Sequence, residues 1–214
     1  KTRGCRSNTY SSSKSQGREQ MTTALIDGDI VVYRCACSAE KDEQSIALMR
    51  TDLLMQEIMS ATGADSYKLF LSSPTGSNNF RTKLDPNYKL NRAKTPRPTH
   101  FDATRMFLVT HWKAEMVDGY EADDAMGMTQ TEGQTIICSI DKDMLQVPGN
   151  HWNFVKKEAR YVTEDEGLKA FFTQTLVGDR SDNIIGVPGI GPVKAAKILD
   201  PLTTTQYYKA CLDL

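Results

Sequence analysis

The sequence predicts an α/β fold with a mainly parallel central sheet flanked by helices. Three short apolar runs rich in β-branched residues are typical of buried strands, and longer segments with helical spacing lie between them. This alternation favours a parallel sheet with helices on both faces. Hydrophobic residues make up 39% of the 214 residues, and no apolar run approaches the roughly 18 residues of a membrane span. We therefore expect a soluble globular protein without a membrane span.

Residues 1–20 differ in composition from the rest of the chain. They are rich in Ser, Lys and Arg and almost free of large apolar side chains, so they cannot contribute to a core. We expect a disordered leader before Met21, with a basic DNA-binding arm as the alternative. The five cysteines form no CxxC pair and the three histidines are scattered. This disfavours a zinc site and indicates reduced thiols in a cytoplasm.

The expected strands and helices follow in chain order. Strands are predicted at 24–29, 67–73 and 135–140, and helices at 44–61 and 99–115. Thr163, with Glu166 three residues later, forms a capping box that opens a further helix. In a sheet of this kind the functional site lies beyond the carboxyl ends of the strands.

Acidic residues gather at those predicted strand ends. Asp27 ends the first strand, and Asp141 and Asp143 follow the third; as residues i and i+2 they are expected to point to the same side. A helix is expected to begin near Glu121, and a later pair of acids stands one helical turn apart. The full candidate set is Asp27, Glu121, Asp123, Asp124, Asp141, Asp143, Asp179 and Asp182.

Eight carboxylates in one place would repel one another strongly. Two like charges about 4 Å apart cost roughly 4 kcal/mol at an effective dielectric of about 20. A single acidic pair is more typical of solvated surface, but here two groups end strands of one predicted sheet. Divalent cations would relieve the repulsion, and oxygen-only ligands suit Mg²⁺ or Mn²⁺ rather than zinc. The pattern predicts two such ions, an arrangement used for phosphodiester cleavage.

Basic residues are concentrated at 81–97. The segment RTKLDPNYKLNRAKTPR holds six Lys and Arg residues against one acid, with Tyr88 among them. This composition suits single-stranded or frayed nucleic acid, with cations on phosphates and the Tyr88 ring stacked on a base; a solvated loop is the alternative. Because the segment follows the strand at 67–73, we expect it to lie over the acidic group. Arg81, Lys83 and Tyr88 are candidate DNA-binding residues.

A glycine-rich turn, GVPGIG at 186–191, precedes a predicted helix with two lysines. The pattern is typical of a helix–hairpin–helix, in which glycines let backbone N–H groups approach phosphates and the helix N-terminus adds positive charge. Such an element binds the duplex backbone without reading its sequence. The candidate DNA-binding residues are Gly186, Gly189, Gly191, Lys194 and Lys197.

Five segments resemble, in the expected order, the motifs of the 5′-nucleases. This family comprises the flap endonucleases, the 5′-nuclease domain of bacterial DNA polymerase I and the bacteriophage 5′-to-3′ exonucleases, and the phage members look most similar. The segments are DGDIVVYR, YKLNR, YEADD, SIDKD and GDRSDNIIGVPGIGPVKAAKIL, within residues 24–199. The resemblance implies a PIN-like α/β nuclease core, two divalent metals, and a helix–hairpin–helix that often holds a monovalent cation such as K⁺.

The resemblance also implies roles for individual residues. The eight carboxylates would bind the two metals, some through water. Lys89 and Arg92 would belong to an arch over the 5′ strand, and Arg34 would contact the reacting phosphate. Two departures stand out: Ser72 and Ser73 occupy the place where relatives usually carry an aspartate, and the chain stops at 214 where relatives usually continue. We expect the serines to raise the metal requirement without abolishing activity, with Ser73 facing the site and Ser72 the other face.

The sequence thus predicts a metal-dependent 5′-to-3′ exonuclease or flap endonuclease that hydrolyses DNA, or RNA in hybrids, to 5′-phosphate products. Its expected parts are a leader at 1–20, a PIN-like core at 21–160 with an arch segment at 78–97, and a shortened helix–hairpin–helix region at 161–214. We expect a monomer that acts on DNA with a 5′ end or flap alongside replication proteins, in the cytoplasm of a bacterial host if a phage encodes it. A PIN-type endoribonuclease and a non-catalytic structure-specific DNA-binding protein remain alternatives.

Overall fold

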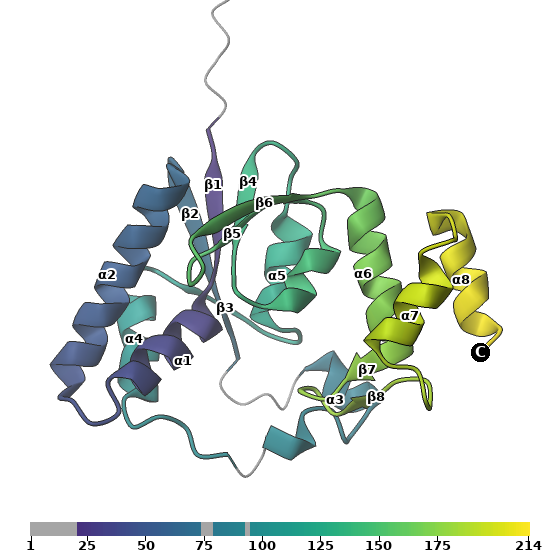
Figure 1. Ribbon diagram of the computed structural model, residues 1–214. Helices are drawn as coiled ribbons and strands as arrows, with labels where there is room; N and C mark the ends of the chain where they lie inside the picture. Colours follow the sequence, from purple (N-terminus) through teal and green to yellow (C-terminus); the bar gives the residue numbers. More distant parts are fainter. Residues whose placement is uncertain (1–20, 74–78, 93–94) are drawn as a thin grey trace, which may run out of the picture.

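A six-stranded sheet forms the centre of the computed structural model, which describes residues 21–73, 79–92 and 95–214 (Figure 1). The strand order is β3-β2-β1-β4-β5-β6. The first five strands run parallel to their neighbours, and only β6 is antiparallel, so the predicted mainly parallel sheet is confirmed. The strands are β1 (Thr23–Asp27), β2 (Ser66–Ser72), β3 (Glu115–Val117), β4 (Thr135–Cys138), β5 (Gly149–Asn153) and β6 (Glu158–Val162). The expected leader at 1–20 and residues 78 and 93–94 of the expected arch lie outside the described residues.

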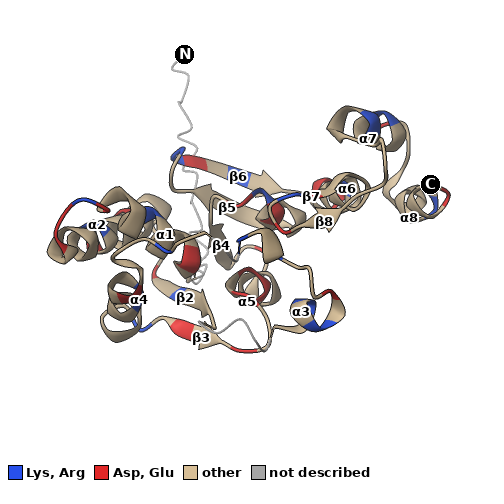
Figure 2. Ribbon diagram, turned by 90° about the horizontal axis from the view of Figure 1, so that it is seen from below, with Lys and Arg blue, Asp and Glu red and all other residues tan. Residues whose placement is uncertain are grey.

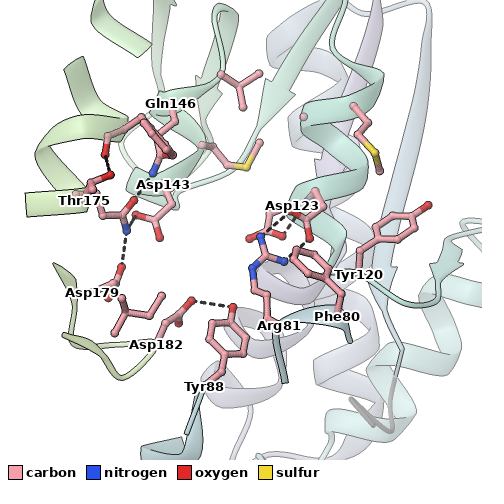
Figure 3. A pocket seen from close by; sticks show the side chains of 18 of the residues that line it. Phe80, Arg81, Tyr88, Tyr120, Asp123, Asp143, Gln146, Thr175, Asp179 and Asp182 are labelled. Atoms are coloured by element: carbon pink, nitrogen blue, oxygen red, sulfur yellow. Dashed lines mark hydrogen bonds and ion pairs between the residues drawn. The ribbon is translucent and has the colours of Figure 1, made fainter. Parts of the chain in front are cut away.

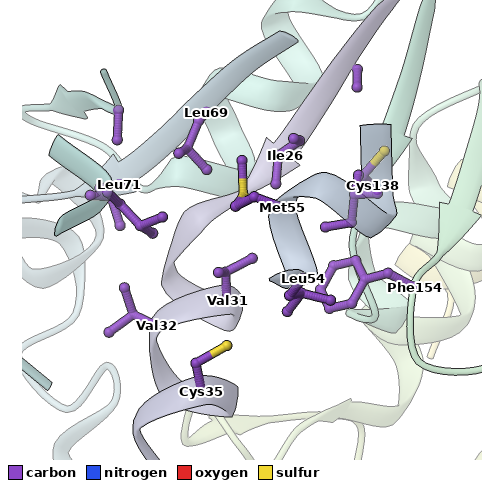
Figure 4. Close-up of a cluster of buried hydrophobic side chains, with 14 of the residues drawn as sticks. Ile26, Val31, Val32, Cys35, Leu54, Met55, Leu69, Leu71, Cys138 and Phe154 are labelled. Atoms are coloured by element: carbon purple, nitrogen blue, oxygen red, sulfur yellow. The ribbon is translucent and has the colours of Figure 1, made fainter. Parts of the chain in front are cut away.

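Helices cover both faces of the sheet because successive strand residues point to opposite sides. On one face, Ala24 and Ile26 pack with α1 (Gly28–Ser38), α2 (Gln44–Thr62) and α4 (Phe101–Thr110). On the other face, Leu25 packs with α5 (Ala122–Thr129) and the 3₁₀ helix η2 (Lys142–Gln146). Figure 4 shows the first of these cores, in which strand and helix side chains interdigitate: Ile26, Val31, Val32, Leu54, Met55, Leu69, Leu71 and Cys138.

The C-terminal part has a small core of its own. It consists of α6 (Glu164–Val177), the two-stranded hairpin β7 (Gly178–Asp179) and β8 (Ile184–Ile185), α7 (Pro192–Leu199) and α8 (Thr204–Leu212). Buried Leu176, Ala195, Leu199 and Tyr207 join the three helices. The predicted capping box is confirmed: the Glu166 N–H donates to the Thr163 hydroxyl (3.2 Å) and the Thr163 N–H to the Glu166 carboxylate (2.9 Å).

Several local predictions were wrong at element boundaries. The first strand ends at Asp27 because that residue caps α1, which begins at the next residue. The helix expected at 99–115 ends at Thr110, and three strands were not expected: β3 and β6 at the two edges of the sheet, and β5 beside β6. Asp179 and Asp182 do not stand one helical turn apart, because they lie in β7 and in the turn of the β7–β8 hairpin.

Two short helices complete the described chain. These are α3 (Phe80–Leu84) and the 3₁₀ helix η1 (Leu90–Arg92), which lie between β2 and α4 in sequence and near the β7–β8 hairpin in space (Figure 1). None of the helices within the described ranges is long and apolar enough to cross a membrane.

Candidate active site

Acidic residues from distant parts of the chain meet at the carboxyl ends of the parallel strands. Asp27 is buried at the end of β1, where its carboxylate accepts hydrogen bonds from the Ile30 N–H (3.1 Å) and from the Ser139 hydroxyl beyond β4 (2.9 Å). The helix expected near Glu121 is α5, and the Glu121 N–H donates to the Asp124 carboxylate (3.0 Å). The parallel sheet therefore gathers the first three predicted acidic groups at one edge.

A first cleft of about 750 Å³ opens beside this edge. Five acids and five cations line it: Asp27, Asp29, Glu121, Asp123 and Asp141, with Arg34, Lys89, Arg92, Arg97 and Arg105. Among the described residues, the ion pairs leave Asp27, Asp123 and Asp141 without a cation within 4.0 Å. An added cation would therefore meet three carboxylates that lack a counter-charge from the described residues.

Two acids of the first cleft, Asp27 and Asp123, have raised pKa values because they are buried among like charges. Burial raises the pKa of Asp27 to about 7, and the charges of Asp29 and Asp123 add to the rise. Burial also raises the pKa of Asp123 to about 6, with Glu121 and Asp124 contributing. A divalent cation would favour the ionised form of both, and their oxygens are the ligands that Mg²⁺ prefers. Within the described ranges no three His, Cys, Asp or Glu side chains are arranged about one point to hold a metal.

A second cleft of about 950 Å³ lies between α5, η2, α6 and the β7–β8 hairpin (Figure 3). Asp143 and Asp179 lie on its α6 side, where the Gln174 amide donates to both, at 2.9 Å and 2.8 Å. Asp123 lies on the opposite, α5 side, and lines both clefts. Burial acts against ionisation of Asp179, but hydrogen bonds from Ser181 and Lys142 outweigh it and lower its pKa.

Asp141 and Asp143 do not point into one cleft as expected. The strand β4 ends at Cys138, so the alternation of a strand does not apply to residues 141–143. Instead, Asp141 caps η2 by accepting a hydrogen bond from the Asp143 N–H (2.9 Å). Its carboxylate lines the first cleft, and that of Asp143 lines the second.

Lys89 and Arg92 lie against the acidic group, where the sequence placed the basic segment. The Lys89 ammonium is 2.6 Å from Glu121 and 3.7 Å from Asp182, and the Arg92 guanidinium is 2.6 Å from Asp182. These ion pairs supply counter-charge that the sequence argument had assigned to metals alone. Part of the expected repulsion is therefore relieved by the protein itself.

Tyr88 and Arg81 are also turned toward the acids. Tyr88 is buried and its hydroxyl lies 3.0 Å from both Glu121 and Asp182; Figure 3 shows the contact with Asp182. The expected stacking of its ring on a base therefore does not fit the structure. Arg81 makes two hydrogen bonds to Asp124, at 2.5 Å and 2.7 Å, instead of facing open solvent. In Figure 2, the ribbon of α3 is blue at its Lys and Arg residues and that of α5 is red at its acidic residues. Lys83 lies in α3 as well.

Comparison with known proteins places this arrangement in a family. The family model described as "5′-3′ exonuclease, N-terminal resolvase-like domain" matches residues 22–173. The chain belongs to this 5′-3′ exonuclease family. A curated 5′-3′ exonuclease of Mycoplasma pneumoniae is 32% identical over 224 residues, which cover 88% of this chain and 75% of that protein. DNA polymerase I of Bacillus caldotenax is 27% identical over 88% of this chain, which corresponds to 24% of the polymerase.

Solved structures show the same fold for this exonuclease-family chain. The bacteriophage T5 5′-exonuclease with bound zinc ions has a TM-score of 0.60 and 18% identity, and the match covers 84% of this chain and 74% of that one. The T5 flap endonuclease in a pseudo-enzyme–product complex with DNA and metal ions has a TM-score of 0.59, 18% identity, and coverage of 84% and 75%. The expected PIN-like 5′-nuclease fold is confirmed.

The glycines of the C-terminal segment have different local environments. A Cβ on Gly186 would stand 2.2 Å from the Val177 carbonyl carbon, so this glycine is required by the close approach of β8 to the end of α6. Gly189 has a φ of +77°, and Gly191 precedes α7 with nothing within 4 Å of an added Cβ. The backbone is therefore open at Gly189 and Gly191 but not at Gly186. Lys194 and Lys197 lie in α7, and the phosphate-binding role of this segment stays a prediction.

Sequence reasoning missed three residues that shape the site. Asp29 and Arg105 line the first cleft, and Gln174 bridges acids in the second. Asp29 could have been found from its position two residues after Asp27, across a strand–helix junction. Arg105 could have been found as an arginine on the apolar face of the helix at 101–110.

The expectation for the two serines was wrong in one respect. Ser72 and Ser73 both line the first cleft. Ser72 lies on the same face of β2 as Phe70, which packs toward α5, and its hydroxyl accepts a hydrogen bond from the Ala122 N–H (2.9 Å). Its side chain does not point away from the site.

Proposed function

We propose that the chain is a divalent-metal-dependent 5′-to-3′ exonuclease and flap endonuclease that hydrolyses DNA, or RNA in hybrids, to 5′-phosphate products. One observation carries the proposal: in a chain of the exonuclease family, a single cleft is lined by five acids and five cations. Carboxylates suit a divalent cation and basic side chains suit the phosphate that the cation must meet. The T5 relatives with metal ions and with DNA support it.

The carboxylates divide into two sets in the proposed enzyme. Asp27, Asp123 and Asp141 would hold one Mg²⁺ or Mn²⁺ ion with Glu121, and the second set, Asp124, Asp143, Asp179 and Asp182, would hold the other. When bound, these ions would withdraw charge from the phosphate oxygens and make water a better nucleophile. Arg34, Lys89 and Arg92 would orient the reacting phosphate, since all three line the first cleft.

The C-terminal segment would bind the DNA duplex in the proposed enzyme. The turn at 186–191 and the start of α7 would bind the duplex backbone as a helix–hairpin–helix, with K⁺ as the monovalent cation. The substrate would be DNA with a 5′ end or flap, and the enzyme would act as a monomer beside replication proteins. The site of action would be the cytoplasm, where the DNA substrate lies.

One assay tests the proposal against its alternatives. Labelled 5′-flap DNA, blunt duplex DNA and single-stranded RNA are each incubated with Mg²⁺ or with EDTA. We expect cleavage of the two DNA substrates with Mg²⁺ only, with the 5′-phosphate on the product. Cleavage of the RNA alone would favour an endoribonuclease, and DNA binding without cleavage would favour a non-catalytic binding protein.

A further inference from the structure

Asp29 is an acid of the first cleft that is held from two sides. It lies in the first turn of α1, two residues after Asp27, and its side chain is 28% exposed. One carboxylate oxygen accepts a hydrogen bond from the Ser72 N–H (3.0 Å) and the other accepts one from Arg105 (3.1 Å). The carboxylate therefore sits at the carboxyl end of β2 although it belongs to α1.

Arg105 is the residue that fixes this position. Its side chain is only 10% exposed, and its guanidinium also donates to the Ser72 carbonyl. It projects from α4, whose neighbouring residues Phe101 and Leu108 are buried in the core. A buried cation is costly without a partner, so Arg105 and Asp29 hold each other in one orientation at the end of β2.

The end of β2 has no acid of its own. Ser72 and Ser73 stand there, and the Ser72 hydroxyl is engaged by the first N–H of α5. The carboxylate of Asp29 occupies the vicinity of the Ser72 N–H and lines the same cleft as Asp27 and Asp123. Each of its oxygens accepts one hydrogen bond from these two partners and keeps a further lone pair.

We propose that Asp29 supplies the carboxylate of the β2 side to the divalent cation of the first cleft, and that Arg105 is the positioning residue that holds Asp29 there. This inference rests on the proposed function. Asp29 and Arg105 then have a role in metal binding, which the residues of a purely structural ion pair would not have. The ligand set of the first cleft then comprises acids from the end of β1, from the first turn of α1, from the start of α5 and from the cap of η2.

Binding of Mn²⁺ to the full chain, measured without DNA by the electron paramagnetic resonance of free Mn²⁺, tests the inference. The Asp29→Asn variant is expected to bind Mn²⁺ at least about tenfold more weakly, because even the loss of a group that only supports a metal ligand costs about 10–100-fold. The double variant Asp29→Asn/Arg105→Gln removes both charges, so it should recover thermal stability but not Mn²⁺ affinity. Recovery of Mn²⁺ affinity in the double variant would mean that the pair is only structural.

The Arg105→Gln variant distinguishes positioning from simple electrostatics. Loss of a positive charge alone would strengthen cation binding, whereas loss of orientation at Asp29 would weaken it; we expect a weakening. Tighter binding would overturn the positioning role. Asp42→Asn is a matched control, because Asp42 forms an exposed ion pair with Arg50 (2.9 Å), and it should leave Mn²⁺ affinity unchanged.

Cleavage of 5′-flap DNA by the wild type distinguishes a failure of the role of Asp29 from a failure of the proposed function. A wild type that cleaves and binds Mn²⁺, with an Asp29→Asn variant of equal affinity, would overturn this inference alone. A wild type that neither binds Mn²⁺ nor cleaves would overturn the proposed function and the inference together.

Discussion

Asp141 is the residue whose removal best separates chemistry from folding. Its carboxylate caps η2 and has no described cation within 4.0 Å, and asparagine can replace it in the cap. We expect Asp141→Asn to lower the single-turnover rate on 5′-flap DNA by about 100-fold, the order of loss for one electrostatic group in an active site. The melting temperature in metal-free buffer should stay equal or rise. A rate close to wild type, or an equal loss in the exposed control Asp165→Asn, would contradict the metal assignment.

Tyr88 is expected to stabilise the fold and not to bind DNA. Its hydroxyl lies 3.0 Å from two carboxylates, Glu121 and Asp182, but has only one proton to donate. One hydrogen bond to a charged group contributes about 1.5–3 kcal/mol. We expect Tyr88→Phe to lower the free energy of unfolding by about 1–3 kcal/mol while DNA affinity is unchanged. Urea unfolding and fluorescence anisotropy measure the two quantities. Tyr208→Phe, at an exposed tyrosine, is the control; weaker DNA binding by the Tyr88 variant would restore the base-stacking interpretation.

The residue types of the site could be predicted from the sequence, but their partners could not. Asp27 and Glu121 were found because they stand at a strand end and a helix start, which are local features. The contact of Tyr88 with Asp182 joins residues 94 positions apart. No local spacing encodes such a pair, so the sequence could not show that Tyr88 faces inward.

The basic segment at 81–97 and the helix α7 are expected to have different roles in the reaction. Lys89 lies in the first cleft, 2.6 Å from Glu121, whereas Lys194 lies in the exposed first turn of α7. We expect Lys89→Ala to lower the single-turnover rate more than it weakens duplex binding. Lys194→Ala should mainly weaken binding and reduce the salt dependence of the dissociation constant by roughly one phosphate contact. Loss of affinity alone in both variants would show that the roles are not divided.

The glycine turn between α6 and α7 allows a matched comparison. A Cβ at position 186 would overlap the backbone of Val177 and Gly178, at 2.2 Å and 2.4 Å, whereas one at Gly191 would meet nothing within 4 Å. Gly186→Ala should therefore destabilise the chain by about 1–3 kcal/mol, the usual cost of overpacking, and Gly191→Ala by under about 1 kcal/mol. Thermal and urea unfolding give both values. Equal losses would mean that the backbone at 186 relaxes freely.

Element types were predictable where periodicity was long, and boundaries were not. The helix at 44–61 matches α2 closely because its apolar spacing persists for several turns. The predicted strand at 135–140 runs two residues too far because Ser139 and Ile140 are compatible with a strand, and the capping of η2 by Asp141 decides otherwise. That difference of two residues sends Asp141 and Asp143 into separate clefts.

The whole molecule balances its acidic site with its own cations. Arg81, Lys89, Arg92 and Lys142 each contact one or more of the candidate metal ligands. The four come from elements far in sequence from most of the acids, so the balance is a property of the complete fold. It follows that divalent cations, when they bind, compete with basic side chains of the protein.

This competition leads to a prediction about folding without metal. We expect EDTA to leave the circular dichroism spectrum of the wild type unchanged, because ion pairs already offset part of the repulsion. The variant Arg81→Gln/Lys89→Gln/Arg92→Gln loses three of the cations and should melt at a lower temperature in EDTA than the wild type. Saturating Mg²⁺ should raise its melting temperature more than that of the wild type, because Mg²⁺ competes with fewer internal cations in the variant. A ligand at about 100 times its dissociation constant adds about 2.7 kcal/mol to the free energy of unfolding.

The control Lys68→Gln/Lys156→Gln/Lys209→Gln changes the net charge equally at exposed sites. An equal response to Mg²⁺ in the two triple variants would show that net charge, and not the ion pairs of the site, sets the metal dependence of stability.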